Sequence, residues 1–172
     1  MEWRQLTIDI YERISQVLER ALEGLTQDDL NQQPNPDSNS MGWLTWHLTR
    51  GQDRAIVGLM NEEQLWVKDG WHSRFNRSPA LLDTGFGHNL ADLAAFKSPD
   101  GQTLLAYHLT VLERTKRYIG KLSETDLERE LGHPRFPTVG ARLVAVISDN
   151  FQHAGQTAYA RGQLKGKGWL DV

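Results

Sequence analysis

Apolar residues recur every three or four positions along four segments of the chain, and almost no segment shows the alternation of a strand. The first segment runs from Trp3 to about Gly24, with charged residues on its opposite face. The others cover about residues 41 to 60, about 101 to 122 and about 138 to 162. This pattern predicts an all-α fold, an up-down four-helix bundle that forms one domain over residues 1–172.

Turn-forming residues separate the predicted helices. Prolines mark the loop around Pro34-Asn35-Pro36-Asp37 and the break at Pro134-Arg135-Phe136-Pro137. Ser38-Asn39-Ser40 offers an N-cap for the second helix. The motif Leu-(Thr/Ser)-x-x-Asp-Leu follows both the first and the third helix, at residues 25–30 and 122–127. The echo indicates either two related helical hairpins or simply two good capping sequences, and both explanations stay open.

The connection from Asn61 to Pro99 is long for a bundle and too aromatic for a disordered segment. We expect an ordered flap over one end of the bundle, with a short helix from Asn89 to Phe96. Such a flap either helps to close a substrate pocket or only covers apolar surface. Arg50, Arg54 and the arginines of the flap could attract an anionic substrate, with solvation at the surface as the alternative.

Composition excludes several classes of protein. The formal net charge is −3 and no segment is strongly basic, so we expect no nucleic-acid partner. No stretch approaches the roughly 20 apolar residues of a membrane span, and the first residues do not resemble a signal peptide. We therefore expect a cytoplasmic protein without a membrane partner. The absence of cysteine excludes disulfides and a cysteine nucleophile.

Three residues form a candidate metal site. Asp149 and His153 stand four residues apart, which places them on one face of the fourth helix. His47 lies in the apolar stripe of the second helix. If the two helices face each other, two imidazoles and one carboxylate surround one divalent ion and leave a coordination position open. A buried Asp149–His153 hydrogen bond without a metal, and a core role for His47, are the simpler alternatives.

Two further residues bear on this site. His108 lies near the centre of the third helix's apolar face, where it is either a group that faces the ion or a hydrogen-bonded core histidine. For Gln156 we expect a capping or interface role. The sequence does not assign a role to His88.

Two motifs carry a resemblance to a known family. The stretch Ser-Met-Gly-Trp-Leu-Thr-Trp-His-Leu at residues 40–48 and His153-Ala154-Gly155-Gln156 resemble the DinB-like metal-binding superfamily. That group includes the damage-inducible DinB proteins and thiol-dependent S-transferases and isomerases. The resemblance covers essentially the whole chain and implies His47, Asp149 and His153 as the ligands. Most members have histidine where Asp149 stands, although the mycothiol-dependent maleylpyruvate isomerases look similar in placing a carboxylate there.

The resemblance also implies a function. We expect a divalent ion, with zinc or nickel as first choices, that activates a low-molecular-weight thiol or a water molecule. Because the chain has no cysteine, the thiol must arrive on a small cosubstrate. The implied reaction is transfer of that thiol to an electrophile, or a thiol-assisted isomerisation. The alternatives are a non-catalytic binding protein and a stress-related protein whose metal only links two helices. A homodimer is a further partner that we consider.

Overall fold

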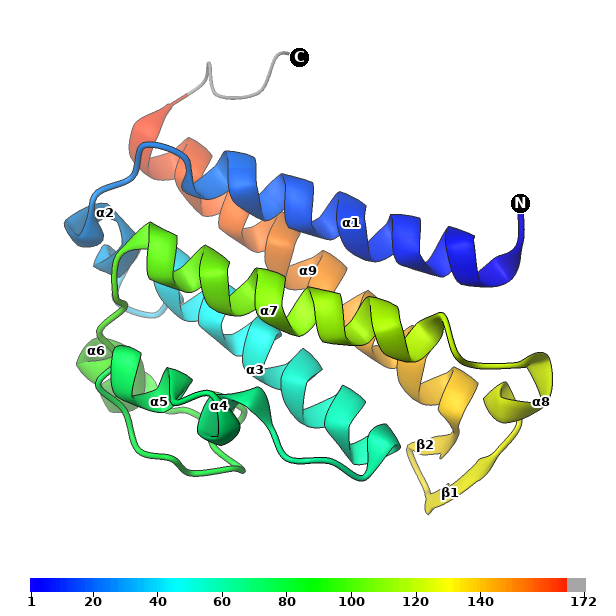
Figure 1. Ribbon diagram of the computed structural model, residues 1–172. Coiled ribbons are helices and arrows are strands. Elements are labelled where there is room, and N and C mark those ends of the chain that lie inside the picture. Colours follow the sequence, from blue (N-terminus) through cyan, green and yellow to red (C-terminus); the bar gives the residue numbers. More distant parts are fainter. Residues whose placement is uncertain (167–172) are drawn as a thin grey trace.

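Four long helices make up most of the protein. The computed structural model describes residues 1–166. The long helices are α1 (Trp3–Leu22), α3 (Met41–Met60), α7 (Gly101–Ile119) and α9 (Val139–Lys165). They lie side by side, with α1 and α3 each in contact with both α7 and α9 (Figure 1). The prediction of an all-α fold is confirmed, and α3 has the bounds that the apolar pattern predicts.

The directions of the four helices differ from the alternating up-down order that we predicted. Along α3 and α7, Thr49 contacts His108 and Gln52 contacts Thr115, so the two helices run in the same direction. Figure 1 shows the same relation, with α1 and α9 both running the opposite way. The long connection between α3 and α7 explains the difference, because it carries the chain back along the length of α3 before α7 begins.

That connection is ordered and packs against the long helices. It contains three short helices, α4 (Leu65–Lys68), α5 (Trp71–Arg74) and α6 (Leu90–Ala95). The predicted short helix after residue 88 is therefore confirmed, and Asn89 caps it. Trp66 of α4 packs against Trp46 of α3 and Tyr107 of α7. Trp66, Trp71 and Phe75 of the connection thus belong to an apolar layer against the helices, whereas Phe86 is exposed.

The repeated Leu-(Thr/Ser)-x-x-Asp-Leu motif has a local explanation. It forms two short helices, α2 (Gln27–Asn31) after α1 and α8 (Glu124–Leu127) after α7. Thr26 and Asp29 form a capping box at α2, and Ser123 and Asp126 form the same arrangement at α8. Capping therefore accounts for the Thr or Ser and the Asp that the two copies share.

A short hairpin precedes the last helix, and the apolar pattern did not predict it. Strand β1 (Glu130–His133) pairs antiparallel with β2 (Phe136–Thr138). Strands this short are hard to detect, because three or four residues cannot establish an alternating pattern. Thr138 then caps α9 by accepting a hydrogen bond from the backbone N–H of Ala141. The hairpin is consequently fixed at the start of α9.

Helix α3 is the most enclosed element of the fold. Ser40 caps it as expected, and every residue from Met41 to Arg50 is buried. A helix that is covered all round needs partners for each polar side chain that it carries. His47 therefore lies in an interior position with defined neighbours. No helix within residues 1–166 is both long and apolar enough to cross a bilayer.

Candidate metal centre

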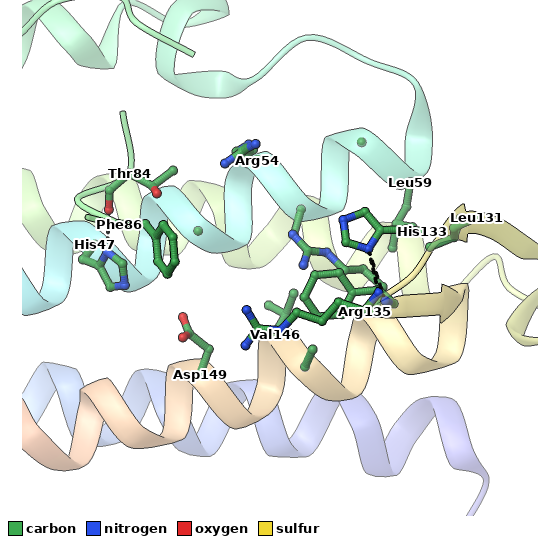
Figure 2. Close-up of a pocket in the computed structure, with 16 residues that line it drawn as sticks. His47, Arg54, Leu59, Thr84, Phe86, Leu131, His133, Arg135, Val146 and Asp149 are labelled. Atoms are coloured by element: carbon green, nitrogen blue, oxygen red, sulfur yellow. Dashed lines mark hydrogen bonds between the residues drawn. The ribbon is translucent and has the colours of Figure 1, made fainter. Parts of the chain in front are cut away.

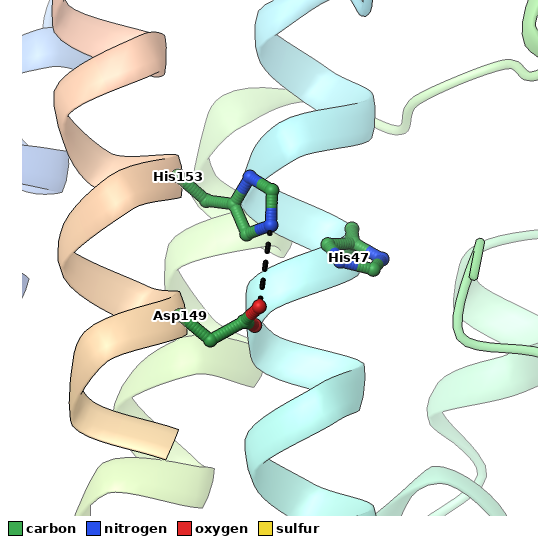
Figure 3. A group of neighbouring side chains, drawn as sticks. All are labelled: His47, Asp149 and His153. Atoms are coloured by element: carbon green, nitrogen blue, oxygen red, sulfur yellow. Dashed lines mark ion pairs between the residues drawn. The ribbon is translucent and has the colours of Figure 1, made fainter. Parts of the chain in front are cut away.

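The structure brings His47, Asp149 and His153 together where α3 faces α9. Each residue offers one ligand atom, and these atoms all lie within 4.8 Å of one another. The three side chains converge from the two helices on one small region (Figure 3). The rings of His47 and His153 meet edge to face, with centroids 4.6 Å apart. The second and fourth predicted helices therefore face each other, as the candidate site required.

A backbone carbonyl of the connection fixes His47. Its Nδ1 lies in hydrogen-bond contact with the carbonyl oxygen of Thr84. A carbonyl can only accept, so Nδ1 carries the proton and Nε2 keeps its lone pair. The ring also stacks on Trp43, with centroids 4.7 Å apart and planes 8° from parallel. Together these contacts set both the tautomer and the orientation of the imidazole.

Gly85 makes this contact with Thr84 possible. Its φ is +86°, a backbone conformation that side chains disfavour. A Cβ there would lie 2.7 Å from the Trp43 ring and 3.1 Å from Nδ1 of His47. The Asp83-Thr84-Gly85-Phe86-Gly87-His88 string therefore includes a residue that lets the connection approach the histidine. The sequence alone does not indicate which helix these six residues contact.

His153 is oriented by its own helix. Its Nδ1 donates to Oε1 of Gln156, 2.7 Å away, so Nε2 keeps a lone pair when the ring is neutral and donates to Asp149 when the ring is protonated. That Nε2 lies 3.5 Å from Oδ1 of Asp149. We expected a capping or interface role for Gln156, and the structure instead shows it holding the imidazole. The three-residue spacing from His153 is the sequence signal for this contact.

Asp149 approaches α3 at a glycine. A Cβ on Gly51 would lie 3.7 Å from Oδ2 of Asp149, so a larger side chain there would crowd the carboxylate. Gly51 stands four residues after His47, one turn further along the same helix. The carboxylate side chain is 46% exposed, whereas that of His153 is 18% exposed. Solvent can therefore reach the site from the side of Asp149.

The charges of the three groups influence one another. Burial, followed by the neighbouring His153, lowers the pKa of His47 below its ordinary value. Burial also works to lower the pKa of His153, but its hydrogen bonds with Asp149 and Gln156 outweigh that effect and raise it. Burial tends to raise the pKa of Asp149, and the bond to His153 and nearby positive charge lower it instead. Asp149 is therefore ionised at neutral pH, beside a His47 imidazole that stays neutral.

A hydrogen-bonded chain holds the Thr84 segment against α3. Nε1 of Trp43 donates to Nδ1 of His88, 3.1 Å away, and Nε2 of His88 lies 3.2 Å from Asp83. Arg77 pairs with the other oxygen of Asp83 at 2.8 Å and lies over the ring of Trp46. His88 therefore acts on the site indirectly, by positioning the segment that contacts His47.

Arg50 has a structural role that differs from both expectations. Its side chain is fully buried rather than solvated or available to a substrate. Its guanidinium donates to Oε1 of Gln64 at 2.8 Å and to the carbonyl oxygens of Ala80, Leu81 and Asp83. The planar group with several donors is suited to binding a folded-back loop. Arg50 thus anchors the connection on α3.

His108 is a core histidine. Its Nδ1 lies 3.2 Å from the hydroxyl of Thr49, which itself donates to the carbonyl of Thr45. Burial lowers the pKa of His108 to about 4, so it is neutral at pH 7. It is not among the residues whose charges shift the pKa of His47. The core alternative therefore describes this residue, and a role facing the site does not.

A cavity of about 540 Å³ opens beside the three residues. It begins at His47 and Asp149 and extends between α3 and α9 towards the β1–β2 hairpin (Figure 2). Arg54 lines it and is exposed, which agrees with both expectations for this residue, attraction of an anionic substrate and solvation at the surface. Phe86 stands at its mouth beside His47, with 85% of its surface exposed. A small molecule that enters this cavity would reach the histidine–carboxylate group.

The donor set has the chemistry of a metal site. Two imidazole nitrogens and one carboxylate oxygen are ligands that divalent transition metals bind in proteins. Both histidines have a partner on the ring nitrogen that faces away from the group, the arrangement that orients such ligands. The group could therefore hold a metal ion, with the cavity on the side where further ligands would enter.

Comparisons with known proteins give a structural neighbour and the family of this chain. A crystal structure described as that of the conserved protein of locus from Enterococcus faecalis superposes with a TM-score of 0.88 and 28% sequence identity. The match covers 97% of this chain and 99% of that one. None of the curated proteins matches the chain. The sequence model of the DinB superfamily matches residues 10–157, most of the chain, and the protein therefore belongs to the DinB superfamily.

Proposed function

We propose that His47, Asp149 and His153 bind one divalent metal ion, and that the protein is a metal-dependent enzyme. Its reaction is the transfer of a low-molecular-weight thiol to an electrophile, or a thiol-assisted isomerisation. The observation that carries the proposal is the convergence of three ligand atoms within 4.8 Å from two separate helices. A simple Asp149–His153 pair would not require His47 to point at the same place.

The outer contacts of the histidines support metal binding over a structural cluster. With both Nδ1 atoms donating outward, two lone pairs and a carboxylate face one another. Such an arrangement of acceptors is unfavourable unless a cation lies between them. A proton on His153 can satisfy part of this cluster of acceptors, whereas a divalent ion would bind all three groups. Zinc and nickel suit nitrogen-rich sites of this kind.

The residues present fit the chemistry that such an ion supplies. When bound, a divalent ion lowers the pKa of a coordinated thiol or water enough to give a nucleophile at neutral pH. Asp149, 46% exposed, leaves the site accessible from the cavity. Thr84 and Gln156 hold the two rings so that, when the imidazoles are neutral, the Nε2 atoms carry the lone pairs that bind metal. Phe86 offers an apolar surface at the mouth of the cavity for a substrate.

The second candidate function is non-catalytic binding of a metal or small molecule. The same ligands would then link α3 to α9, which already pack together. The cavity favours the enzyme, because a purely structural metal site does not need space for a substrate beside it. A homodimer stays a prediction of the sequence.

Elemental analysis and a turnover screen test the proposal together. We expect about one divalent ion per chain in the wild type, and loss of most of that metal in His47→Ala and His153→Ala. His72→Ala is the matched control, because His72 lies on α5 and is not among the converging residues. Equal metal content in all four proteins would refute the site.

Thiol consumption then separates the two functions. The metal-loaded wild type and the His72→Ala control are incubated with low-molecular-weight thiols and a panel of electrophiles. We expect thiol loss that depends on the metal and is absent in His47→Ala. Metal binding without turnover across the panel would favour the non-catalytic candidate.

A further inference from the structure

Three arginines from three separate elements line the far part of the cavity. Arg54 comes from α3, Arg135 from the turn of the β1–β2 hairpin and Arg142 from the second turn of α9. Figure 2 shows the cavity extending from His47 and Asp149 to this basic end. Charge is therefore distributed unevenly along the cavity, because the candidate ligands lie at one end and the guanidinium groups at the other.

The positive charge at this end has little compensation within the protein. Asp149 is the single carboxylate among the described residues that line the cavity, and it belongs to the candidate metal centre. Within residues 1–166, no carboxylate lies within ion-pair distance of Arg54, Arg135 or Arg142. Other arginines are paired, as Arg77 with Asp83 at 2.8 Å, or lie exposed on a helix surface, as Arg13 does on α1. In this cavity three guanidinium groups instead share one lining, in which Asp149 is the single carboxylate.

The guanidinium groups also repel one another. Arg142 is half-buried, and burial followed by the charge of Arg54 lowers its pKa below the ordinary value. Arg135 acts in the same direction, and Asp149 opposes it. Arg54 and Arg135 are exposed, so solvent screens part of this repulsion, and an anion bound among the three groups would relieve the rest. The arrangement therefore favours an anionic ligand.

Phe136 positions two of the three arginines. The guanidinium carbon of Arg142 lies 4.2 Å from the centre of its ring, and that of Arg135 lies 5.4 Å from it. Cation–π contacts of this kind hold the flat groups without using their N–H donors. The donors stay available to a ligand, and a guanidinium can bind a carboxylate or phosphate through two parallel hydrogen bonds.

Small residues leave room for that ligand. The α3 side of the cavity carries Gly51, Ala55 and Gly58, which recur at four and three residues and so share one face. Larger residues at these positions would fill the groove between α3 and α9. The cavity volume of about 540 Å³ lies within the range of sites for small molecules, roughly 300–1,000 Å³.

We propose that Arg54, Arg135 and Arg142 bind the oxyanion group of a small acidic substrate, a carboxylate or a phosphate, while its reactive end faces His47 and Asp149. The role given to the reactive end rests on the proposed function. The three arginines indicate the class of substrate, which neither the metal ligands nor the superfamily model specifies. Arg142 is the central residue of the cluster, because it is half-buried and its charge interacts with both of the others.

Anion binding to metal-free protein tests the cluster separately from the metal. Protein treated with chelator is titrated with succinate, with inorganic phosphate and with neutral succinamide at constant ionic strength. The readout is the shift of backbone amide NMR signals. We expect saturable binding of at least one anion and none of succinamide. The anion that binds more tightly identifies the acidic group.

The variants are Arg142→Gln, Arg142→Lys and the control Arg13→Gln, whose arginine is exposed on α1 away from the cavity. Loss of a charge-assisted pair should weaken anion binding about tenfold or more in Arg142→Gln. Arg142→Lys should recover part of it, and Arg13→Gln should bind as the wild type. Equal affinity of the wild type and Arg142→Gln, or equal binding of succinamide, would overturn the inference.

The same preparations distinguish this inference from the proposed function. Arg142→Gln should retain the metal content of the wild type, whereas His47→Ala should lose the metal but keep anion binding in the metal-free state. Metal binding without anion binding would reject the arginine cluster alone. Anion binding with no metal in any preparation would reject the proposed function and leave the anion site standing.

Discussion

Two groups of polar side chains lie between α3 and its neighbours, about one and a half helical turns apart along α3. In the first, Asn150 donates to Gln52 at 2.5 Å and Gln52 donates to Thr115 at 2.8 Å. Thr115 donates in turn to the carbonyl of Val111. All of these side chains from Asn150 to Thr115 are buried. Each of these donors meets an acceptor that the chain itself supplies, and Oδ1 of Asn150 is buried without a hydrogen-bond partner among residues 1–166.

The second group consists of His47, Asp149 and His153. It differs from the first in its supply of donors and in its burial. With neutral imidazoles it brings together three acceptors, and two of the three side chains are only partly buried. Asp149 and Asn150 are neighbours in sequence, so their side chains point about 100° apart around α9. The chain buries the polar group for which it supplies both donors and acceptors. The group that offers acceptors stays accessible to solvent, as the proposed metal site requires.

Acidification should have the largest effect on this difference. Hydrogen bonds with Asp149 and Gln156 raise the pKa of His153, and burial lowers that of His47. As pH falls, His153 gains a proton first, and metal affinity should drop about tenfold per pH unit, then more steeply once His47 is protonated. Competition with a chelator from pH 7.5 to 4.5 measures the affinity.

A change of fold must be excluded in the same pH series. His108, with its pKa lowered to about 4, stays neutral in the folded protein while the unfolded chain gains a proton below about pH 6.5. The free energy of unfolding should thus fall by about 3 kcal/mol as pH drops from about 6.5 to about 4. Circular dichroism shows whether the helices persist. Full metal retention in chelator at pH 4.5, with the helices intact, would argue against imidazole ligands.

Substitution of Asp149 should have the next largest effect. Asp149→Ala leaves two ligands, and we expect metal affinity to fall by about 100-fold or more, since even the outer partners of ligands are worth ten- to hundredfold. Asp149→His should keep the metal and lower the pKa of a bound water or thiol, because the site loses a negative charge. Competitive titration of the variants against a chromophoric chelator measures both affinities.

Gln152→Ala provides the control for Asp149, because Gln152 lies on the same helix and points into solvent. It should bind metal as the wild type does. If Asp149→Ala also binds as tightly as the wild type, the carboxylate is not a ligand and the Asp149–His153 hydrogen bond becomes the better interpretation.

Gly85→Ala should have an intermediate effect. The new Cβ would meet Trp43 at 2.7 Å and His47 at 3.1 Å, which displaces Thr84 from the histidine. We expect metal affinity to fall about 10- to 100-fold. Gly87→Ala is a close control, because Gly87 also has a positive φ, +83°, but has nothing within 4 Å of a Cβ. Equal affinities in the two variants would show that the Thr84 contact does not support the site.

Asn150→Leu should have the smallest effect on metal and a clear effect on folding. It removes the donor to Gln52 and leaves a buried amide oxygen without it, which costs about 1–3 kcal/mol of unfolding free energy. Metal affinity should stay within about twofold of the wild type, because Asn150 bonds to Gln52 and is not among the converging ligands. Urea unfolding and chelator competition give the two quantities. A large loss of metal with normal stability would contradict the separation of the two groups.

The sequence by itself determined the local structure and the candidate ligands. The bounds of α3, the cap at Ser40 and the short helix before Phe96 follow from apolar period and capping residues. The four-residue spacing of Asp149 and His153 places both on one face of α9. These features depend on neighbours within a few turns of the same segment, and such neighbours can be read directly from the sequence.

The tertiary structure decided how the segments meet. The parallel course of α3 and α7 depends on the path of the connection, and so do the contact of Thr84 with His47 and the burial of Arg50. The basic cluster joins Arg54, Arg135 and Arg142, which lie up to 88 residues apart in the chain (142 − 54). No periodic pattern links residues at such separations. Their proximity arises from the packing of α3 against α9 and from the hairpin at the start of α9.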